Sequence, residues 1–215
     1  MRAIAPQGII AVLCLAAALL TASACTLAES FLVTSTPTPA PPSGALLEER
    51  LPQMLLRQDD LPSGFVAWSE SYQRNEDILA RAGGDPEVVR SLRNSGRQTG
   101  YVAVYQAMDP TDVALEGIFV ILELYDRPEQ ASTALYRDPR QVAGTAMRPV
   151  TIDPLADESL AYTATSQDSA LYSVWFRKDR LTAAVFTSSV ASDASVEEAH
   201  AFAQRLLAHV QAAGL

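Results

Sequence analysis

The spacing of apolar residues after residue 45 predicts a domain built mainly from β-strands. In Gly100–Ala107 the side chains of Tyr101, Ala103 and Tyr105 alternate with those of Val102, Val104 and Gln106, whereas Gly117–Asp126 is apolar on both faces for most of its length. The first pattern is typical of a strand with one buried face, and the second of a central strand. Further strands are expected at Phe65–Trp68, Met147–Ile152, Ser159–Thr165, Leu171–Arg177 and Leu181–Ser188. A short polar turn, Lys178–Arg180, separates the last two and predicts an antiparallel hairpin.

Helical spacing is clearest near the end of the chain. Ser195 followed by Glu198 fits a capping box, and the apolar residues after it share one face at a period of 3.6. These residues are Ala199, Phe202, Ala203, Leu206, Val210 and Ala213. Other helices are expected over Leu46–Gln58, after an Asn75 cap, after Asp85-Pro86 and after Arg127-Pro128. In the first of these, Pro52 favours a helix confined to the residues after Leu51. We therefore predict an α+β fold: a mainly antiparallel sheet of about six or seven strands, with helices packed on it and a C-terminal amphipathic helix across it.

The N-terminal residues have the features of a cleaved export signal. Arg2 provides a positive charge, the run Ile9–Leu20 is apolar, and small residues follow at 22–24. The apolar run is shorter than the roughly 20 residues of a membrane-spanning helix. Ala22-Ser23-Ala24-Cys25 resembles the lipobox of bacterial lipoproteins. That resemblance implies a signal peptide at 1–24, an acylated Cys25, and a chain that is lipid-anchored at the extracytoplasmic face of the cell membrane.

Composition changes again between the cysteine and the domain. Thr34–Gly44 is rich in proline, serine and threonine, which favours an extended spacer over a packed element. We therefore expect a tether at 25–44 and a single globular domain at 45–215. The only other cysteine, Cys14, lies in the expected signal, so the mature chain would form no internal disulfide.

The charge balance argues against some partners. The net charge is −9, and loss of Arg2 with the signal would leave 15 basic and 25 acidic residues, a charge of −10. Lys178 is the only lysine. An acidic chain of this kind is a poor ligand for nucleic acid or for anionic lipid headgroups, so no nucleic-acid partner is expected.

Four features of the domain belong together: the strings Gly96–Tyr101 and Leu155–Ser159, the Val174–Val185 hairpin and the terminal amphipathic helix. Together they resemble the extracytoplasmic sensor-type domains of bacterial lipoproteins and membrane kinases. The resemblance implies a PsbP-like fold, in which helices lie on the faces of an antiparallel sheet. The chain departs from that pattern at Ala156, where glycine is expected, and in lacking paired cysteines.

Motifs for catalysis are absent: the sequence has no G-x-S-x-G elbow, P-loop, H-E-x-x-H, EF-hand loop or dinucleotide fingerprint. His200 and His209 fall on opposite faces of the last helix, where we expect solvated side chains that share no metal. Lys178 is expected to be solvated and protonated in its turn. No enzyme activity, cofactor or metal is therefore predicted.

Acidic residues leave one catalytic alternative open. Asp153, Asp157 and Glu158 cluster in one loop, and Glu123 is expected to point inward from a central strand. Two converging carboxylates could hydrolyse envelope material, and a loop of hard oxygen ligands could hold calcium. Such clusters are more often solvated, so we treat an envelope hydrolase as an alternative only.

Aromatic side chains are the better candidates for binding. Six of them lie on or near expected strands: Trp68, Tyr101, Tyr105, Tyr125, Tyr172 and Trp175. On an open sheet face they could stack on a small ligand, a glycan or a peptide of an envelope protein, although rings at such positions more often pack beneath helices. The sequence thus favours a non-catalytic binding or sensor-type lipoprotein of the cell envelope, with a structural or assembly role as a further alternative.

Overall fold

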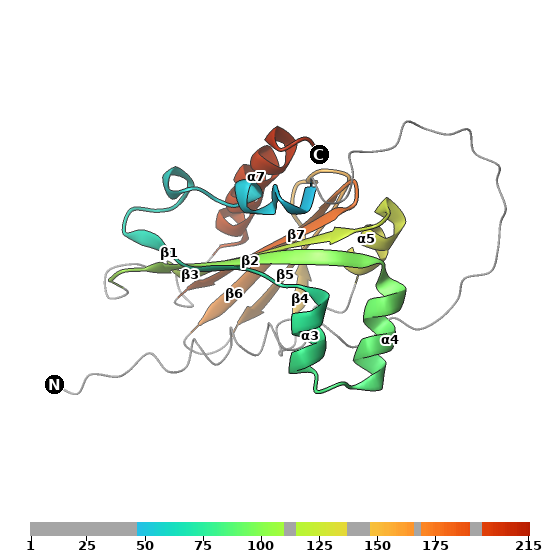
Figure 1. Ribbon diagram of the computed structural model, residues 1–215. Coiled ribbons are helices and arrows are strands. Elements are labelled where there is room, and N and C mark those ends of the chain that lie inside the picture. The colour runs from blue at the N-terminus through green and yellow to red at the C-terminus, as the bar shows by residue number, and fades with distance from the viewer. Residues whose placement is uncertain (1–46, 110–114, 137–146, 166–168, 190–194) are drawn as a thin grey trace.

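A seven-stranded antiparallel sheet organises the chain in the computed structural model, which describes residues 47–109, 115–136, 147–165, 169–189 and 195–215 (Figure 1). The strands are β1 (Phe65–Tyr72), β2 (Arg97–Ala107), β3 (Leu115–Tyr125), β4 (Arg148–Val150), β5 (Glu158–Thr165), β6 (Ala170–Lys178) and β7 (Leu181–Ser189). Their spatial order is β1-β2-β3-β7-β6-β5-β4. Two meanders, β1–β3 and β4–β7, therefore meet where β3 pairs with β7. The predicted α+β class and antiparallel sheet are confirmed.

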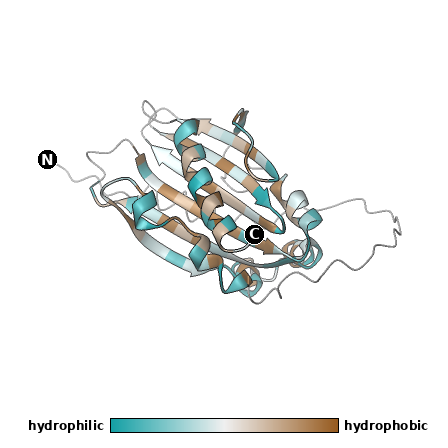
Figure 2. Ribbon diagram, turned by 90° about the horizontal axis from the view of Figure 1, so that it is seen from above, coloured by the Kyte–Doolittle hydropathy of each residue, from teal (hydrophilic) through white to brown (hydrophobic). Residues whose placement is uncertain are grey.

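Short helices fill the connections, and one long helix ends the chain. They are the 3-10 helices η1 (Leu51–Met54) and η2 (Gln58–Asp60) and the α-helices α3 (Asn75–Arg81), α4 (Pro86–Ser95), α5 (Pro128–Leu135) and α7 (Val196–Ala212). Helix α7 lies across one face of the sheet, as predicted (Figure 2). The expected N-caps Asp85 and Ser195 accept hydrogen bonds from Glu87 N and Glu198 N.

The main core lies between the sheet and a cover made by α7 and residues 47–56. Phe202, Leu206 and Val210 of α7 are buried over strand residues such as Val120 and Val185. Each fully buried side chain of this size contributes about 1.5–3 kcal/mol of transfer free energy, so this layer dominates the stability of the domain.

The opposite face of the sheet carries a smaller apolar cluster. Phe119 of β3, Trp175 of β6 and Phe186 of β7 pack together there, and Leu135 of α5 joins them. The rings of Trp175 and Phe186 meet edge to face with centroids 5.4 Å apart. The apolar pattern of β3 on both of its faces follows from these two layers.

A buried ion pair joins four segments at one end of the sheet. Nε of Arg97 donates to Oε1 of Glu123 over 2.7 Å, and the two side chains are 2% and 5% exposed. The same guanidinium donates to Asn75 Oδ1 at the start of α3 and to Gln73 O after β1. Tyr125 Oη donates to the second Glu123 oxygen over 2.8 Å. Glu123 thus points inward, and its charge is balanced by a network that holds β1, α3, β2 and β3 together.

Gly100 is required by this network. A Cβ atom at that position would collide with the Arg97 guanidinium and lie 2.9 Å from Leu122 O. Gly96 ends α4 in the left-handed region with φ of 66°, where a Cβ would also meet the Gln130 side chain. Both glycines of the Gly96–Tyr101 string therefore have steric causes.

Two predictions about local structure are wrong. The helix expected over Leu46–Gln58 is replaced by η1 and η2, because Pro52 lacks an amide donor and Leu55 is extended at φ −70° and ψ 164°. Asn75 does not cap α3: Arg74 precedes the helix, and the Asn75 amide instead donates to Arg97 O over 2.7 Å. The buried arginine recruits a side chain that local sequence alone would assign to capping.

Ala156 occupies a backbone conformation that favours glycine, with φ of 52°. Replacement by glycine should relieve a left-handed strain of about 1–2 kcal/mol, and the larger unfolded-state entropy of glycine should offset part of this gain. We expect Ala156→Gly to raise the free energy of unfolding by about 0.5–1 kcal/mol in urea denaturation.

A matched control is available in α3. Ala80 is an exposed helical residue, so Ala80→Gly should lower the free energy of unfolding by about 1 kcal/mol. A loss of stability in both variants would contradict the strained conformation assigned to Ala156.

Candidate functional site

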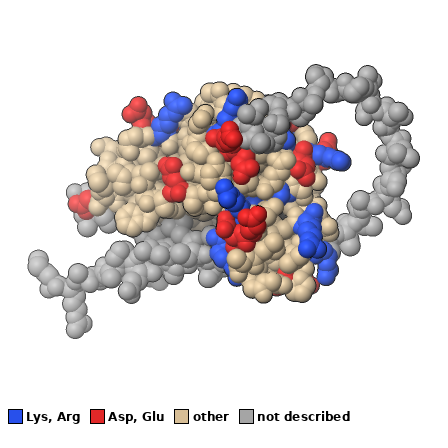
Figure 3. All heavy atoms as spheres, viewed as in Figure 1, with Lys and Arg blue, Asp and Glu red and all other residues tan. Residues whose placement is uncertain are grey.

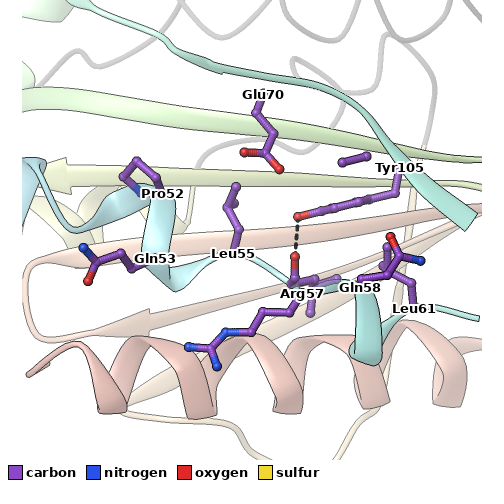
Figure 4. A pocket seen from close by; sticks show the side chains of 10 residues that line it. Pro52, Gln53, Leu55, Arg57, Gln58, Leu61, Glu70 and Tyr105 are labelled. Carbon is purple, nitrogen blue, oxygen red and sulfur yellow. Dashed lines mark hydrogen bonds between the residues drawn. The ribbon is translucent and has the colours of Figure 1, made fainter.

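A groove of about 450 Å³ lies between residues 52–61 and the β1–β2 edge of the sheet (Figure 4). The irregular segment that contains η1 and η2 forms one wall, and β1 forms the other. The lining side chains are Pro52, Gln53, Leu55, Leu56, Arg57, Gln58, Leu61, Ala67, Glu70 and Tyr105. The three leucines and the Tyr105 ring give the groove apolar surface, and Gln53, Arg57, Gln58 and Glu70 give it polar groups.

Tyr105 fixes the floor of the groove. Its ring reaches from β2 toward the covering segment, and its hydroxyl donates to Leu56 O over 3.0 Å (Figure 4). The side chain is only 1% exposed, and burial raises the pKa of the phenol far above its usual range. Tyr105 therefore stays neutral and holds the wall of the groove in place, and it is not an acid or a base for catalysis.

The polar groups of the groove stand on opposite walls. Gln58 Nε2 donates to Phe65 O over 2.7 Å, which ties η2 to the start of β1. Glu70 extends from β1 toward the Tyr105 ring, and Arg57 lies on the facing wall (Figure 4). Both charged side chains are exposed. The groove can therefore offer a carboxylate, a guanidinium and amides to a bound molecule, together with apolar contact.

The groove wall is also tied to α7. His209 Nε2 lies 2.7 Å from Asp60 Oδ2, and Arg205 donates to Asp60 O over 2.6 Å. Burial opposes ionisation of the Asp60 carboxyl, but the hydrogen bond from Arg57 N and the interactions with His209 and Arg205 outweigh it, so its pKa is lowered. An ionised Asp60 thus stabilises the position of η2 against the long helix.

The six candidate aromatic residues do not form one binding surface. Tyr105 lines the groove from β2, and Trp68, which is 68% exposed, lies on the neighbouring edge strand β1. Tyr101 is on the same sheet face as Tyr105, as the alternation predicts, but is buried edge to face against Tyr72.

The other three lie away from the groove. Tyr172 is half-buried against the main core on β6. Tyr125 packs with Ala131 and Ala134 of α5 on the opposite side of the sheet, where Trp175 is 8% exposed. Helices and neighbouring strands therefore cover most of the aromatic set.

The candidate acidic loop is held in ion pairs. Arg177 contacts Asp157 at 3.3 Å and Glu158 at 2.7 Å, and Lys178 contacts Asp157 at 3.1 Å. Burial opposes ionisation of both carboxyls. At Asp157 the hydrogen bonds from Asp179 N and Lys178 outweigh this effect of burial, and at Glu158 the hydrogen bonds from Ser132 and Arg177 do. Both pKa values are therefore lowered. A catalytic general acid needs the opposite shift.

Asp153 is exposed and separate from those ion pairs, and its backbone carbonyl lies 3.0 Å from His200 Nε2. His200 and His209 are thus both half-buried and hydrogen-bonded, which corrects the expectation of two solvated histidines. Lys178 is likewise ion-paired. Within the described ranges, no cluster of three or more potential ligand side chains could hold a metal ion, and no helix is long and apolar enough to cross a bilayer.

Sequence reasoning found Tyr105 but missed the rest of the groove. The sequence predicts a regular helix for the lining segment, and such a helix gives no sign that its polar side chains line a groove. Pro52 and the Asp59–Pro62 turn were the available signals, because together they leave too little room for a stable α-helix. The expected signal peptide, Cys25 and the tether lie outside the described residues.

Comparison with known proteins gives a likeness in fold alone. No protein-family model matches the sequence, and no curated protein is significantly similar to it. The extracellular domain of PknH from Mycobacterium tuberculosis superposes with a TM-score of 0.54 at 8% identity, covering 77% of this chain and 96% of that domain. An uncharacterised protein from Mycobacterium smegmatis, the Rv0999 ortholog, gives a TM-score of 0.39 at 14% identity, and the match covers 78% of this chain and 96% of that protein. The PsbP-like character suggested by the sequence stays a prediction.

The Asp60 contact predicts a pH dependence of stability. Since the folded-state pKa of Asp60 lies below its ordinary value of 3.8, its contribution is complete above that value and is lost as the pH falls through the folded-state pKa. We expect Asp60→Asn to lower the free energy of unfolding by about 1–2 kcal/mol at neutral pH, and the deficit to shrink in acid.

The measurement is urea denaturation of both proteins at a series of pH values from neutral to about 2. Asp59→Asn is the matched control, because Asp59 is the exposed neighbour in the same short helix. A deficit of equal size at every pH, or one shared by the Asp59 variant, would show that the Asp60 charge does not hold this wall.

Proposed function

We propose that this chain is a lipid-anchored, extracytoplasmic and non-catalytic binding domain of the cell envelope, with the groove beside β1 as its ligand site. The observation that carries the proposal is the groove itself. It combines an apolar floor, a neutral buried Tyr105 and a few exposed polar groups, and it contains no histidine, cysteine or serine nucleophile among its lining residues. Such a site can hold a molecule but has no evident means of transforming it.

The described acids give little support to the hydrolase alternative. Asp157 and Glu158 are paired with basic side chains, and Glu123 is buried against Arg97. None of these pairs leaves two carboxyl groups facing across an open cleft, as glycoside hydrolysis requires. A binding role is therefore favoured over chemistry at the acidic loop.

Two further observations support the location. The N-terminal sequence has the order of a bacterial lipoprotein: a positive start, an apolar run, small residues and then Cys25. The fold is shared with the extracellular domain of a mycobacterial kinase. A proline-rich tether would place such a domain at a distance from the lipid surface, where its groove could meet soluble or envelope-bound molecules.

The anchor is tested by replacing the proposed acylation site in the full chain. Cys25→Ala removes the thiol that would carry the lipid. The protein should therefore move from the membrane fraction to the soluble extracytoplasmic fraction. The measurement is fractionation with intact-mass spectrometry of the wild-type and variant proteins, and Cys14→Ala is the control. A wild-type mass that lacks the lipid and still includes residues 1–24 would instead indicate an anchoring helix.

The ligand site is tested by native mass spectrometry of the protein purified from its own host. We expect a retained mass that disappears on denaturation and is absent from Ala67→Arg, because a large side chain at that exposed position would fill the groove. Ser69→Arg is the matched control: Ser69 is on the same strand, is also exposed and does not line the groove. A bare mass in the wild-type protein, or an adduct unaffected by Ala67→Arg, would contradict this assignment.

A further inference from the structure

The two edges of the sheet are protected to different degrees. The edge strand β4 has three residues, Arg148–Val150, and its central residue is Pro149, which has no amide donor. Short length, proline and charge are the usual means by which proteins prevent another strand from joining an edge. The other edge strand, β1, is eight residues long, contains no proline and carries one charged side chain, Glu70.

Among the described residues, no element covers the middle of β1 on either face. All five side chains of 67–71 are exposed, and Trp68 among them is 68% exposed. In Figure 3 the left part of the molecule is mostly tan, with scattered acidic and basic side chains. Because large apolar side chains are usually covered, an exposed tryptophan in the centre of an open edge strand is a feature of an interaction site.

The hydrogen-bonding pattern shows which backbone groups are free to pair. Gln73 and Gly100 exchange both of their backbone hydrogen bonds, and the register then continues as Ser71 with Val102 and Ser69 with Val104. In an antiparallel ladder these alternate residues face the partner strand. The N–H and C=O groups of Glu70 therefore point away from β2, toward the open side.

The groove lies directly beside this edge. Ala67 and Glu70 line it from β1, and the register shift between Ala67 and Ser69 places Trp68 at a bulge. A strand added along β1 would present alternate side chains to the groove, because neighbouring strands of a sheet share their faces. The outward backbone of Glu70 and the groove would then bind one ligand together.

We propose that β1 is a docking edge for an extended, basic peptide segment of another envelope protein, which binds by strand addition with alternate side chains in the groove. This inference rests on the proposed binding function and names its ligand class. Backbone hydrogen bonds supply affinity, Trp68 adds an aromatic contact, and Glu70 selects a lysine or arginine on the incoming strand.

Charge decides between this partner and a second copy of the chain. The protein carries a net charge of −9, and the single charged residue of β1 is acidic. Two copies joined edge to edge would bring like charges together, whereas a basic segment would be attracted to the same edge. A second copy is therefore the disfavoured occupant.

The test uses the full chain in mild detergent and a capped synthetic peptide of about eight residues that alternates valine with lysine and threonine. Binding is followed by tryptophan fluorescence, since Trp68 is exposed and Trp175 is buried. We expect a saturable blue shift with a dissociation constant of about 10–100 µM. Trp68→Phe should remove the shift, which would show that the fluorescence change comes from Trp68.

Two protein variants separate the backbone from the charge. Glu70→Pro removes the outward amide without removing a donor to β2, and should weaken binding at least about tenfold. Glu70→Gln keeps that amide and should weaken binding only about two- to fivefold at low salt. On the peptide side, methylation of two adjacent central amides should abolish binding to the wild-type protein, which keeps the test valid if Glu70→Pro fails to fold.

The outcomes distinguish this inference from the function on which it rests. Equal binding by Glu70→Pro and wild type, unchanged binding of the methylated peptide, or no saturable shift up to about 1 mM overturns strand addition. If native mass spectrometry still shows an adduct that Ala67→Arg removes, the ligand site stands and only the peptide class is wrong. A second copy would appear as concentration-dependent dimerisation without peptide, and this result also overturns the proposal.

Discussion

The arrangement of this domain depends on the buried pair of Arg97 and Glu123. Its network joins the end of β1, the first residue of α3, and the strands β2 and β3. Two charges in such an environment are tolerated only when every hydrogen bond is made, and removal of one partner typically costs about 3–5 kcal/mol. The pair therefore acts less as a source of net stability than as a constraint that admits one arrangement of these four segments.

That constraint positions the candidate site. The Arg97 guanidinium fixes one end of β1 through its hydrogen bond to Gln73 O, and the hydrogen bond from Gln58 to Phe65 O fixes the other end. The five exposed residues between these points form a defined edge. The facing wall is held separately, by the hydrogen bond from Tyr105 to Leu56 O and by the contact between Asp60 and His209. A groove whose walls are held by different interactions can keep its shape without a helix over it, which suits the binding of an extended ligand.

The sequence predicted most of the sheet, because strands of this length reveal themselves through alternation and through apolar runs such as that of β3. It also located the capping residues Asp85 and Ser195, where local chemistry decides. It could not predict the groove, since residues 52–61 owe their shape to long-range bonds with β1, β2 and α7. The acids and aromatics were recognised as candidates, but their partners, Arg177 and the helices above the rings, are distant in sequence. Ala156 shows the converse case, in which an expected glycine is explained by a backbone angle.

The claim that β1 is the open side of the domain is tested most directly by residue-level amide hydrogen exchange on the free protein. The account predicts that the Glu70 amide exchanges almost as fast as an unstructured one, while the Ser69 and Ser71 amides on either side are protected by the ladder with β2. Protection of Glu70 equal to that of Ser69 and Ser71 would mean that the edge is already covered, and would contradict the account.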